Sequence, residues 1–375
     1  MNRKITNLYS PDKKRPKLYS EQVYIYKPKE GDWSYSHHQS ISYFNGKFYA
    51  IWSNGRKDED DIGQRVLLSV SENFYNWSEP KPLINSQNGK YSTGVLTAAG
   101  FHQFEGKLIA YIGYYEYKPE NVENGHYKEI GTGHINISLY AVFTEDGETW
   151  SEPIDMGIPV VPNHGPQPTS SGRLIISGNI SFPYTDDRSG LSGWKMTGIY
   201  PEEMKEHIYD DSESFKFVQS KMNWPVGLCE GSFYQTDDKK LHMLLRANGS
   251  NSSMLWVTQS VDDGTTWSEP IETNFSDNDT KFHFDRLPSG KFYYVGSPDP
   301  MGNRCPLVLS ISNDGIVFDQ HFIIADKEYT PRIQGLYKGG SYGYPHTLVH
   351  DGYLYIICSI CKEDVVAFRI PCDTL

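Results

Sequence analysis

The sequence SVDDGTTWSEP at Ser260–Pro270 has three related copies elsewhere in the chain. Thr144–Pro153 (TEDGETWSEP) repeats it almost unchanged, Ser312–Asp319 (SNDGIVFD) has Phe in place of Trp, and Ser71–Pro80 (SENFYNWSEP) is a degenerate copy. In each, an Asp or Asn stands four residues before a large aromatic residue. An Asp-Gly pair favours a tight turn, because Gly accepts positive φ and the carboxylate bonds nearby N–H groups. These copies indicate an internal repeat, which decides the architecture.

The composition favours many short strands over helices. Of the 375 residues 14% are aromatic, including 27 Tyr, and there are 33 Gly and 22 Pro to punctuate turns. The formal charge of −12 disfavours nucleic acid and anionic membranes as partners. No apolar run approaches the roughly 20 residues of a membrane span. A local cluster of Arg side chains would still allow an anionic small substrate.

A second repeated signal is a turn followed by a hydrophobic strand. It occurs six times, at Asn45-Gly46, Glu105-Gly106, Ser171-Gly172, Asp237-Asp238, Ser289-Gly290 and Asp351-Gly352. Each turn is expected to join the first and second strands of a four-stranded sheet. The pattern predicts an all-β fold, a β-propeller of six blades, or of seven if residues 159–220 hide an extra sheet. The one helix expected is a short turn at Pro201–Glu206.

The two ends of the chain are expected to differ. Residues 1–20 are polar and predict an N-terminal arm, whereas residues 21–375 predict a single propeller domain. The last unit ends one strand short at Val365–Ile370, and the strand at Glu21–Tyr26 is expected to complete it and close the ring. The N-terminus lacks the apolar core of a signal peptide. The chain is therefore expected in the cytoplasm, or secreted or periplasmic if a leader has been removed.

Polar residues gather where a propeller binds its ligand, around the axis where the innermost strands begin. The candidates are His37, His38, Arg56, His164, Gln167, Glu230, Arg246, Lys281, His283, Arg304, Tyr342, Tyr344 and His346. Together they predict a site for an anionic ligand, most simply a carboxylate bound by Arg246 and Arg304. Taken singly, His283 and His346 fit core histidines equally well, and Lys281 fits an ordinary surface charge.

The repeated turns resemble the Asp-box (BNR) turns of the sialidase superfamily of propellers. The similarity extends over roughly residues 36–370. It implies that Tyr344 is a nucleophile activated by Glu230, and that Arg246 and Arg304 bind a substrate carboxylate. The first unit departs from the family, because sialidases have Arg-x-Pro there and this chain has HHQS at His37–Ser40.

A narrower similarity is to the sialidase-fold rhamnose-α-1,4-glucuronate lyases, some first described as rhamnosidases, with the ulvan lyases as relatives. It rests on Ser36–Gln39, Trp52–Arg56 and Tyr344–His346. Members of that group have a His at the start of the first blade, as His38 would be. They are usually seven-bladed, unlike the six blades expected here.

That resemblance implies the release of a terminal sugar, such as rhamnose, from a uronic acid by β-elimination. Arg246 or Arg304 would offset the carboxylate charge so that the adjacent carbon becomes acidic. His38 or His37 would remove the proton, and Tyr344 would protonate the leaving oxygen. The remaining candidates are expected to bind the substrate: Arg56, His164, Gln167, Lys281, His283, Tyr342 and His346.

Two other functions fit the same residues. A retaining, sialidase-like exo-glycosidase would use Tyr344 as the nucleophile and Glu230 as its base. A non-catalytic propeller would bind a glycan without cleaving it. In every case the expected partner is an oligosaccharide or glycan carrying a carboxylate. No cofactor is required, and the axial channel is a candidate place for a structural calcium ion, although no ligand cluster in the sequence specifies a metal.

Overall fold

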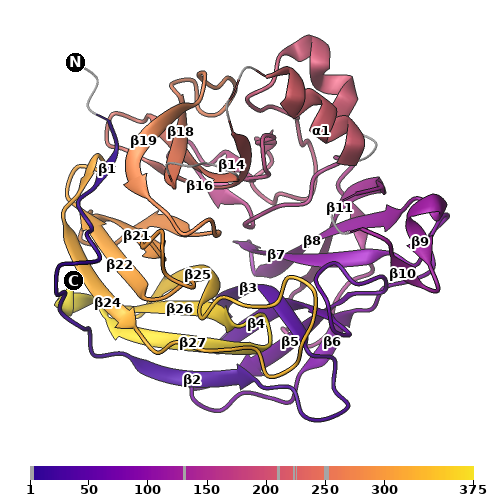
Figure 1. The fold of residues 1–375 in the computed structure, drawn as a ribbon, viewed down its shortest axis with the longest axis horizontal. Helices are drawn as coiled ribbons and strands as arrows, with labels where there is room; N and C mark the ends of the chain where they lie inside the picture. The colour runs from indigo at the N-terminus through magenta and orange to yellow at the C-terminus, as the bar shows by residue number, and fades with distance from the viewer. Residues whose placement is uncertain (1–3, 130–131, 209–211, 223, 225, 249–252) are drawn as a thin grey trace.

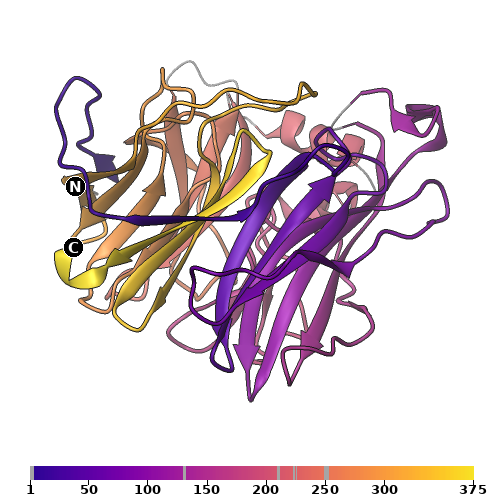
Figure 2. The same cartoon turned by 90° about the horizontal axis from the view of Figure 1, so that it is seen from below.

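The chain folds into β-sheets arranged around a central axis, as the computed structural model shows (Figure 1). The structure describes residues 4–129, 132–208, 212–222, 224, 226–248 and 253–375. Sheets from the first part of the chain stand on one side and sheets from the last part on the other, and the N-terminal segment crosses between them (Figure 2). The fold is all-β with very little helix, as predicted.

Five sheets contain four strands in the order of a propeller blade. In the first unit these are β3 (Tyr35–Phe44), β4 (Lys47–Gly55), β5 (Arg65–Ser71) and β6 (Lys81–Ile84), and in the second β7 (Val95–Phe104), β8 (Lys107–Tyr117), β11 (His134–Thr144) and β12 (Ile154–Asp155). The fourth unit has β16 (Gly227–Gln235), β17 (Leu241–Asn248), β18 (Met254–Ser260) and β19 (Ile271–Ser276). The fifth has β20 (His283–Arg286), β21 (Phe292–Gly296), β22 (Leu307–Ser312) and β24 (Gln320–Ala325). The sixth has β25 (Gly343–His350), β26 (Tyr353–Ile360), β27 (Asp364–Pro371) and β2 (Glu21–Tyr26).

All six predicted turns join the first two strands of a sheet, but the count of six four-stranded blades is met by only five units. The third unit forms a sheet of three two-residue strands, β13 (Gln167–Pro168), β14 (Leu174–Ile175) and β15 (Tyr184–Thr185). Its segment is rich in proline, with Pro162, Pro166, Pro168 and Pro183. Proline has no N–H to donate to a sheet ladder, so these strands cannot lengthen.

The N-terminal segment lies along the outside of several sheets. The predicted pairing of β2 with the last unit is present, because β2 is antiparallel to β27 with Val23 opposite Ala367 (Figure 1). Upstream, β1 (Thr6–Asn7) pairs in parallel with both β19 and β23 (Val317–Phe318). The preceding Ile5 is buried between these sheets. Residues 1–3 of the expected arm lie outside the described residues.

The region expected to hide an extra sheet contains helical turns instead. The turn predicted at Pro201–Glu206 corresponds to the 3-10 helix η2 (Glu202–Ile208), and it is followed by α1 (Ser212–Lys221), which was not predicted. The other irregular elements are η1 (Pro119–Asn121), the hairpin β9 (Val122–Glu123) and β10 (His126–Tyr127), and η3 (Cys372–Thr374). None of the helices in the described part of the chain has the length and apolar character needed to cross a membrane.

The repeated turns share one hydrogen-bond pattern. Side-chain oxygens of Asp146, Asp314 and Asn73 accept from the backbone N–H groups two and three residues further on, at 2.8–3.0 Å. In Ser260–Pro270 the acceptor is Asp262, not the Asp263 that precedes Gly. This copy has one more residue in the turn, so the bonded N–H lies four residues on, at 2.9 Å.

The Trp-Ser-Glu-Pro endings also have a structural explanation. The hydroxyl oxygens of Ser78, Ser151 and Ser268 each accept a 3.0 Å hydrogen bond from a backbone N–H in the strand before the turn. Each serine N–H donates to the carbonyl of the same strand residue at 2.9 Å. The serine therefore fastens the end of the turn to the third strand of its sheet.

One turn glycine packs directly against the neighbouring sheet. Gly147 has φ +80°, and a Cβ placed there would overlap the hydroxyl oxygen of Tyr49 in the first unit. Gly106 has a similar φ of +77° but open space around it. A side chain at either position would strain the backbone, but only one at Gly147 would also press on the neighbouring sheet. Comparing substitutions at the two positions therefore distinguishes backbone strain from contact between sheets.

We expect Gly147→Ala to destabilise the fold more than Gly106→Ala. Both variants should lose about 1–2 kcal/mol, because a Cβ is disfavoured in the left-handed region. Gly147→Ala should lose about 1–3 kcal/mol more through overlap with Tyr49. Urea unfolding of the two variants measures the difference, and adding Tyr49→Phe should recover part of the extra loss. Equal losses would show that the turn does not press on the neighbouring sheet.

Candidate active site

Three first strands lose their register at the residues that the sequence singled out. The ladder is interrupted between His37 and Ser40 in β3, between Cys229 and Gly231 in β16, and between Gly343 and His346 in β25. The interrupted segments contain His38, Glu230 and Tyr344, respectively. A β-bulge turns a side chain away from its regular direction and is common next to active sites. The three bulges bring side chains from three units together.

The centre of this group is the hydroxyl of Tyr344, which donates a hydrogen bond to Oε1 of Glu230. Arg246 donates from Nη1 to Oε2 of Glu230, and the same nitrogen lies 3.2 Å from the Tyr344 oxygen. Its Nε donates to Oδ1 of Asp279 at 2.6 Å. Two carboxylates therefore hold Arg246.

The same contacts determine the protonation of the pair. Burial by itself would raise the pKa of Glu230, but the Arg246 charge and the Tyr344 hydrogen bond lower this pKa to about 2. Burial, followed by the negative charge of Glu230, raises the pKa of Tyr344 well above its usual value. In the free protein the proton therefore lies on Tyr344 and the negative charge on Glu230.

Two further cations lie over the Tyr344 ring. The Lys281 Nζ is 5.3 Å and the Arg304 Cζ 5.6 Å from the ring centroid. Lys281 is buried, and this burial lowers its pKa to about 8 against the opposing effect of Glu230. Nη1 of Arg304 is buried and has no hydrogen-bond partner among the described residues. Arg304, like His38 and Tyr344, has a positive φ, which costs energy and is typical of functional sites.

The two first-unit histidines contact Tyr344 from another side. The His37 ring centroid is 3.9 Å and the His38 centroid 5.3 Å from that of Tyr344. Nδ1 of His37 is 2.9 Å from the Ser359 hydroxyl, whereas its Nε2 and the Nδ1 of His38 are buried without a partner in the described part of the chain. Burial, then the Lys281 charge, lowers the pKa of His38 to about 3. The pKa of His37 also lies well below the usual value, because of burial. Both rings are therefore neutral.

Sequence reasoning missed several charged residues of the site. Glu59 accepts from the Tyr35 hydroxyl at 3.0 Å and from Nζ of Lys362 at 2.7 Å. Lys362 and Glu59 follow the second strands of the last and first units, and Asp279 precedes the first strand of the fifth. The other candidates were selected because they lie just before a first strand or on the loop after a second strand. Glu59, Lys362 and Asp279 lie at such positions too, so the same criterion could have found them.

Three of the predicted histidines form a separate cluster. His164, His283 and His346 come from three units, and their ring centroids are 4.7, 4.8 and 5.9 Å apart. One ring nitrogen of each lies within 4.8 Å of the others. A second set with this property is His37, His38 and Glu59 at the Tyr344 site.

Three other predicted residues do not join either group. Arg56 is exposed, lies over the Trp33 ring and donates to the Ile62 carbonyl oxygen. Gln167 pairs with Ile175 in the third-unit sheet. Tyr342 belongs to the hydrophobic core between the fifth and sixth units, so the prediction that it binds substrate is not supported by its position.

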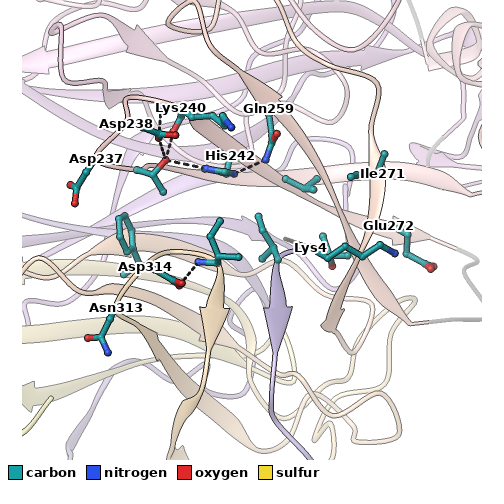
Figure 3. Close-up of a pocket in the computed structure, with 16 residues that line it drawn as sticks. Lys4, Asp237, Asp238, Lys240, His242, Gln259, Ile271, Glu272, Asn313 and Asp314 are labelled. Carbon is teal, nitrogen blue, oxygen red and sulfur yellow. Dashed lines mark hydrogen bonds between the residues drawn. The ribbon is translucent and has the colours of Figure 1, made fainter. Parts of the chain in front are cut away.

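A groove of about 540 Å³ lies at the rim, between the fourth-unit sheet and the turn of the fifth unit (Figure 3). Several of its polar groups are bonded to one another. Both ring nitrogens of His242 have partners, in Thr236 and Gln259, and Asp238 accepts from the Thr236 hydroxyl. The group around Tyr344, by contrast, has buried atoms without partners among the described residues, and it has residues with strained backbones. We therefore regard it as the candidate active site.

Comparison with known proteins supports the architecture. The chain is similar to a sialidase structure with 18% identity and a TM-score of 0.67, over 98% of this chain but 35% of that one. It is similar to a Hadza microbial sialidase (12% identity, TM-score 0.66, 91% of this chain and 66% of that one). It is also similar to the Penicillium chrysogenum α-L-arabinanase (12% identity, TM-score 0.57, 96% and 100%). At these identities the similarity concerns the fold alone. No curated protein matches the sequence.

The family assignment rests on the sequence repeat. The family model of the BNR repeat-like domain matches residues 46–356, which includes all four repeated turns. The chain therefore belongs to the family of BNR repeat-like domains, and it shares the β-propeller fold of the sialidases.

Proposed function

We propose that this chain is a carbohydrate-active enzyme that cleaves a glycosidic bond of a carboxylate-bearing sugar, with Tyr344 as the nucleophile. The observation that carries the proposal is the direct hydrogen bond from Tyr344 to Glu230. A nucleophile in contact with its base, oriented by a third group, is typical of covalent catalysis. Arg246 is that third group. The similar structures bear the names of carbohydrate-active enzymes, sialidase and α-L-arabinanase.

The substrate carboxylate would bind to Arg304 and Lys281 rather than to Arg246. Arg246 already binds the carboxylates of Glu230 and Asp279. In the described part of the chain, Arg304 has a buried nitrogen without a partner, and no carboxylate lies within salt-bridge distance of Lys281. A substrate carboxylate would give both cations a partner, with charge-assisted bonds of about 1.5–3 kcal/mol each.

In this reaction the Tyr344 oxygen attacks the anomeric carbon while its proton passes to Glu230. The glycosidic bond breaks, the leaving oxygen takes a proton from solvent, and an aryl glycoside between the sugar and Tyr344 remains. Water then attacks the anomeric carbon and loses a proton to solvent, and the Tyr344 oxygen recovers its proton from Glu230. Nearby cations favour this path because they stabilise the developing phenolate in a site with little water. The Trypanosoma rangeli sialidase has been solved as a covalent intermediate with 2,3-difluorosialic acid.

A second candidate function is β-elimination, and the histidines favour it. The first unit has no Arg at the sialidase position, and His38 and His37 each keep beside Tyr344 a buried nitrogen that has no partner among the described residues. His38 would take the proton next to a uronate carboxylate while Arg304 offsets the charge, and Tyr344 would protonate the leaving sugar. A terminal rhamnose on glucuronate is the substrate that this candidate would take.

We expect Tyr344→Phe to abolish cleavage, with a fall of at least about 10³-fold in kcat, because the reacting oxygen is removed. Tyr342→Phe is the matched control, since Tyr342 lies two residues away in the hydrophobic core. Sugar release from sialyl and uronosyl oligosaccharides measures both. Activity in Tyr344→Phe close to that of the control would exclude Tyr344 as a reacting residue.

The two reactions give different products. Hydrolysis in ¹⁸O-labelled water should place the label in the released sugar and produce no ultraviolet absorbance, and His38→Ala should retain part of the activity. Elimination should produce the absorbance of a 4,5-unsaturated uronate and lose all activity in His38→Ala. The absorbance together with an unlabelled product would overturn the hydrolase proposal in favour of the lyase.

Carboxylate recognition can be tested on the substrate as well as on the protein. Arg304→Met should lower kcat/KM for the acidic substrate about 10- to 100-fold, corresponding to the loss of one charge-assisted bond. The variant should have little further effect on the methyl ester of the same substrate, which lacks the charge. If Arg304→Met impairs the acid and the ester equally, the residue contributes to structure rather than to recognition.

A further inference from the structure

A cluster of three histidines lies beside the candidate active site and has no part in the proposed reaction. His164 precedes β13, His283 begins β20, and His346 lies in β25, so that three units contribute one side chain each. His164 and His283 are buried and His346 is partly buried. Their ligand nitrogens lie within 4.8 Å of one another. The propeller therefore gathers three imidazoles at a single point from distant parts of the chain.

The outer nitrogens of two rings are already fixed. Nε2 of His164 lies 2.9 Å from the Phe282 carbonyl oxygen, to which it can only donate, so its Nδ1 carries the free lone pair. That Nδ1 is buried and has no hydrogen-bond partner among the residues described. Nδ1 of His283 lies 2.6 Å from the Thr347 hydroxyl, which leaves Nε2 of this ring. Histidines that bind metals usually have the other ring nitrogen held by a carbonyl, carboxylate or hydroxyl in this way.

The donor atoms decide which metal fits. Calcium takes six to eight oxygen ligands in proteins, and the described cluster offers imidazole nitrogens. The expectation of a structural calcium ion in the axial channel therefore does not fit these residues. Imidazole suits zinc, copper, nickel and iron. In a tetrahedral site, zinc–nitrogen distances of about 2.0–2.1 Å place the ligand nitrogens about 3.4 Å from one another. Side-chain rotations that move the nitrogens by about an ångström would bring the three rings to this spacing.

We propose that His164, His283 and His346 bind a divalent transition metal of the zinc type. Three protein ligands leave the fourth position of a tetrahedral ion open. His346 lies two residues after Tyr344 in β25, and His283 begins β20 two residues after Lys281, so the metal would fix the chain close to both of these side chains. The site does not depend on which reaction the enzyme performs.

Lys281 is buried two residues before His283, and its positive charge opposes the binding of a cation nearby. Removing this charge should therefore strengthen binding. Lys281→Met is expected to bind Zn²⁺ more tightly than the wild type, although the same change would weaken the binding of an acidic substrate.

The proposal can be tested by titrating the full chain with Zn²⁺ alone in a calorimeter. Elemental analysis after dialysis then measures how much zinc stays bound. One equivalent should bind, Co²⁺ should give the visible absorption of a tetrahedral site, and Ca²⁺ should bind at no comparable affinity. Thr347→Val removes a hydroxyl that supports a ligand, and such changes usually lower metal affinity about 10- to 100-fold. His164→Gln and His346→Gln remove ligands themselves, so each should lower Zn²⁺ affinity at least about tenfold. Thr347→Ser should retain the affinity, because it keeps the hydroxyl.

Two controls make the result specific. His242→Gln changes a buried histidine at the rim, and His38→Gln changes the other three-residue cluster; both should still bind one equivalent. Thermal unfolding shows which variants fold, and anomalous scattering at the zinc edge locates the ion in the wild type without any substitution. No stoichiometric binding by the wild type, or an ion located away from these three histidines, would overturn the proposal.

Discussion

The axial site depends on the hydrogen bonds of the Glu230 carboxylate, whose side chain is 12% exposed. It accepts hydrogen bonds from Arg246 in its own unit and from Tyr344 in the last unit, and so links two sheets that are distant in sequence. Breaking a buried ion pair by removing one partner costs about 3–5 kcal/mol, because the other charge is left uncompensated. Without Glu230, Arg246 would keep only the more exposed Asp279 as partner, and Lys281 would lose the nearby charge that opposes its desolvation.

The residues around the Glu230–Arg246 ion pair have conformations and buried groups that cost free energy. Three of its residues, His38, Arg304 and Tyr344, have left-handed backbones, each of which costs about 1–3 kcal/mol. Buried nitrogens of both first-unit histidines and of Arg304 lack partners in the described structure. A folded chain can keep such features only if the packing around them is strong. The repeated turns, their serine contacts and the cores between sheets supply that packing, and they lie far from the chemistry.

The sequence is sufficient for features that depend on neighbouring residues and insufficient for those that depend on distant ones. Turn chemistry is local, so the six hairpins and the four Asp-box turns were predictable. The short strands of the third unit and the acceptor role of Asp262 were not predicted, although the prolines and the one extra residue of that turn are local signals for them. The helix α1 was not predicted either. The candidate residues that converge lie near the beginning of a first strand, or at the end of a second strand or on the loop after it. The pairing of Arg246 with Asp279, however, joins residues 33 apart and has no sequence signal.

We propose that Tyr344 forms a covalent bond to the substrate with Glu230 as its base. The most direct measurement is mass spectrometry of the protein after reaction with 2,3-difluorosialic acid and with a 2-fluoro-glucuronosyl fluoride, followed by peptide mapping. These sugars form the adduct quickly and release it slowly. The account predicts a mass increase of one sugar on the peptide containing Tyr344, and none in Glu230→Gln at the same exposure. An adduct on another residue, or turnover of natural substrate without any adduct, would contradict it.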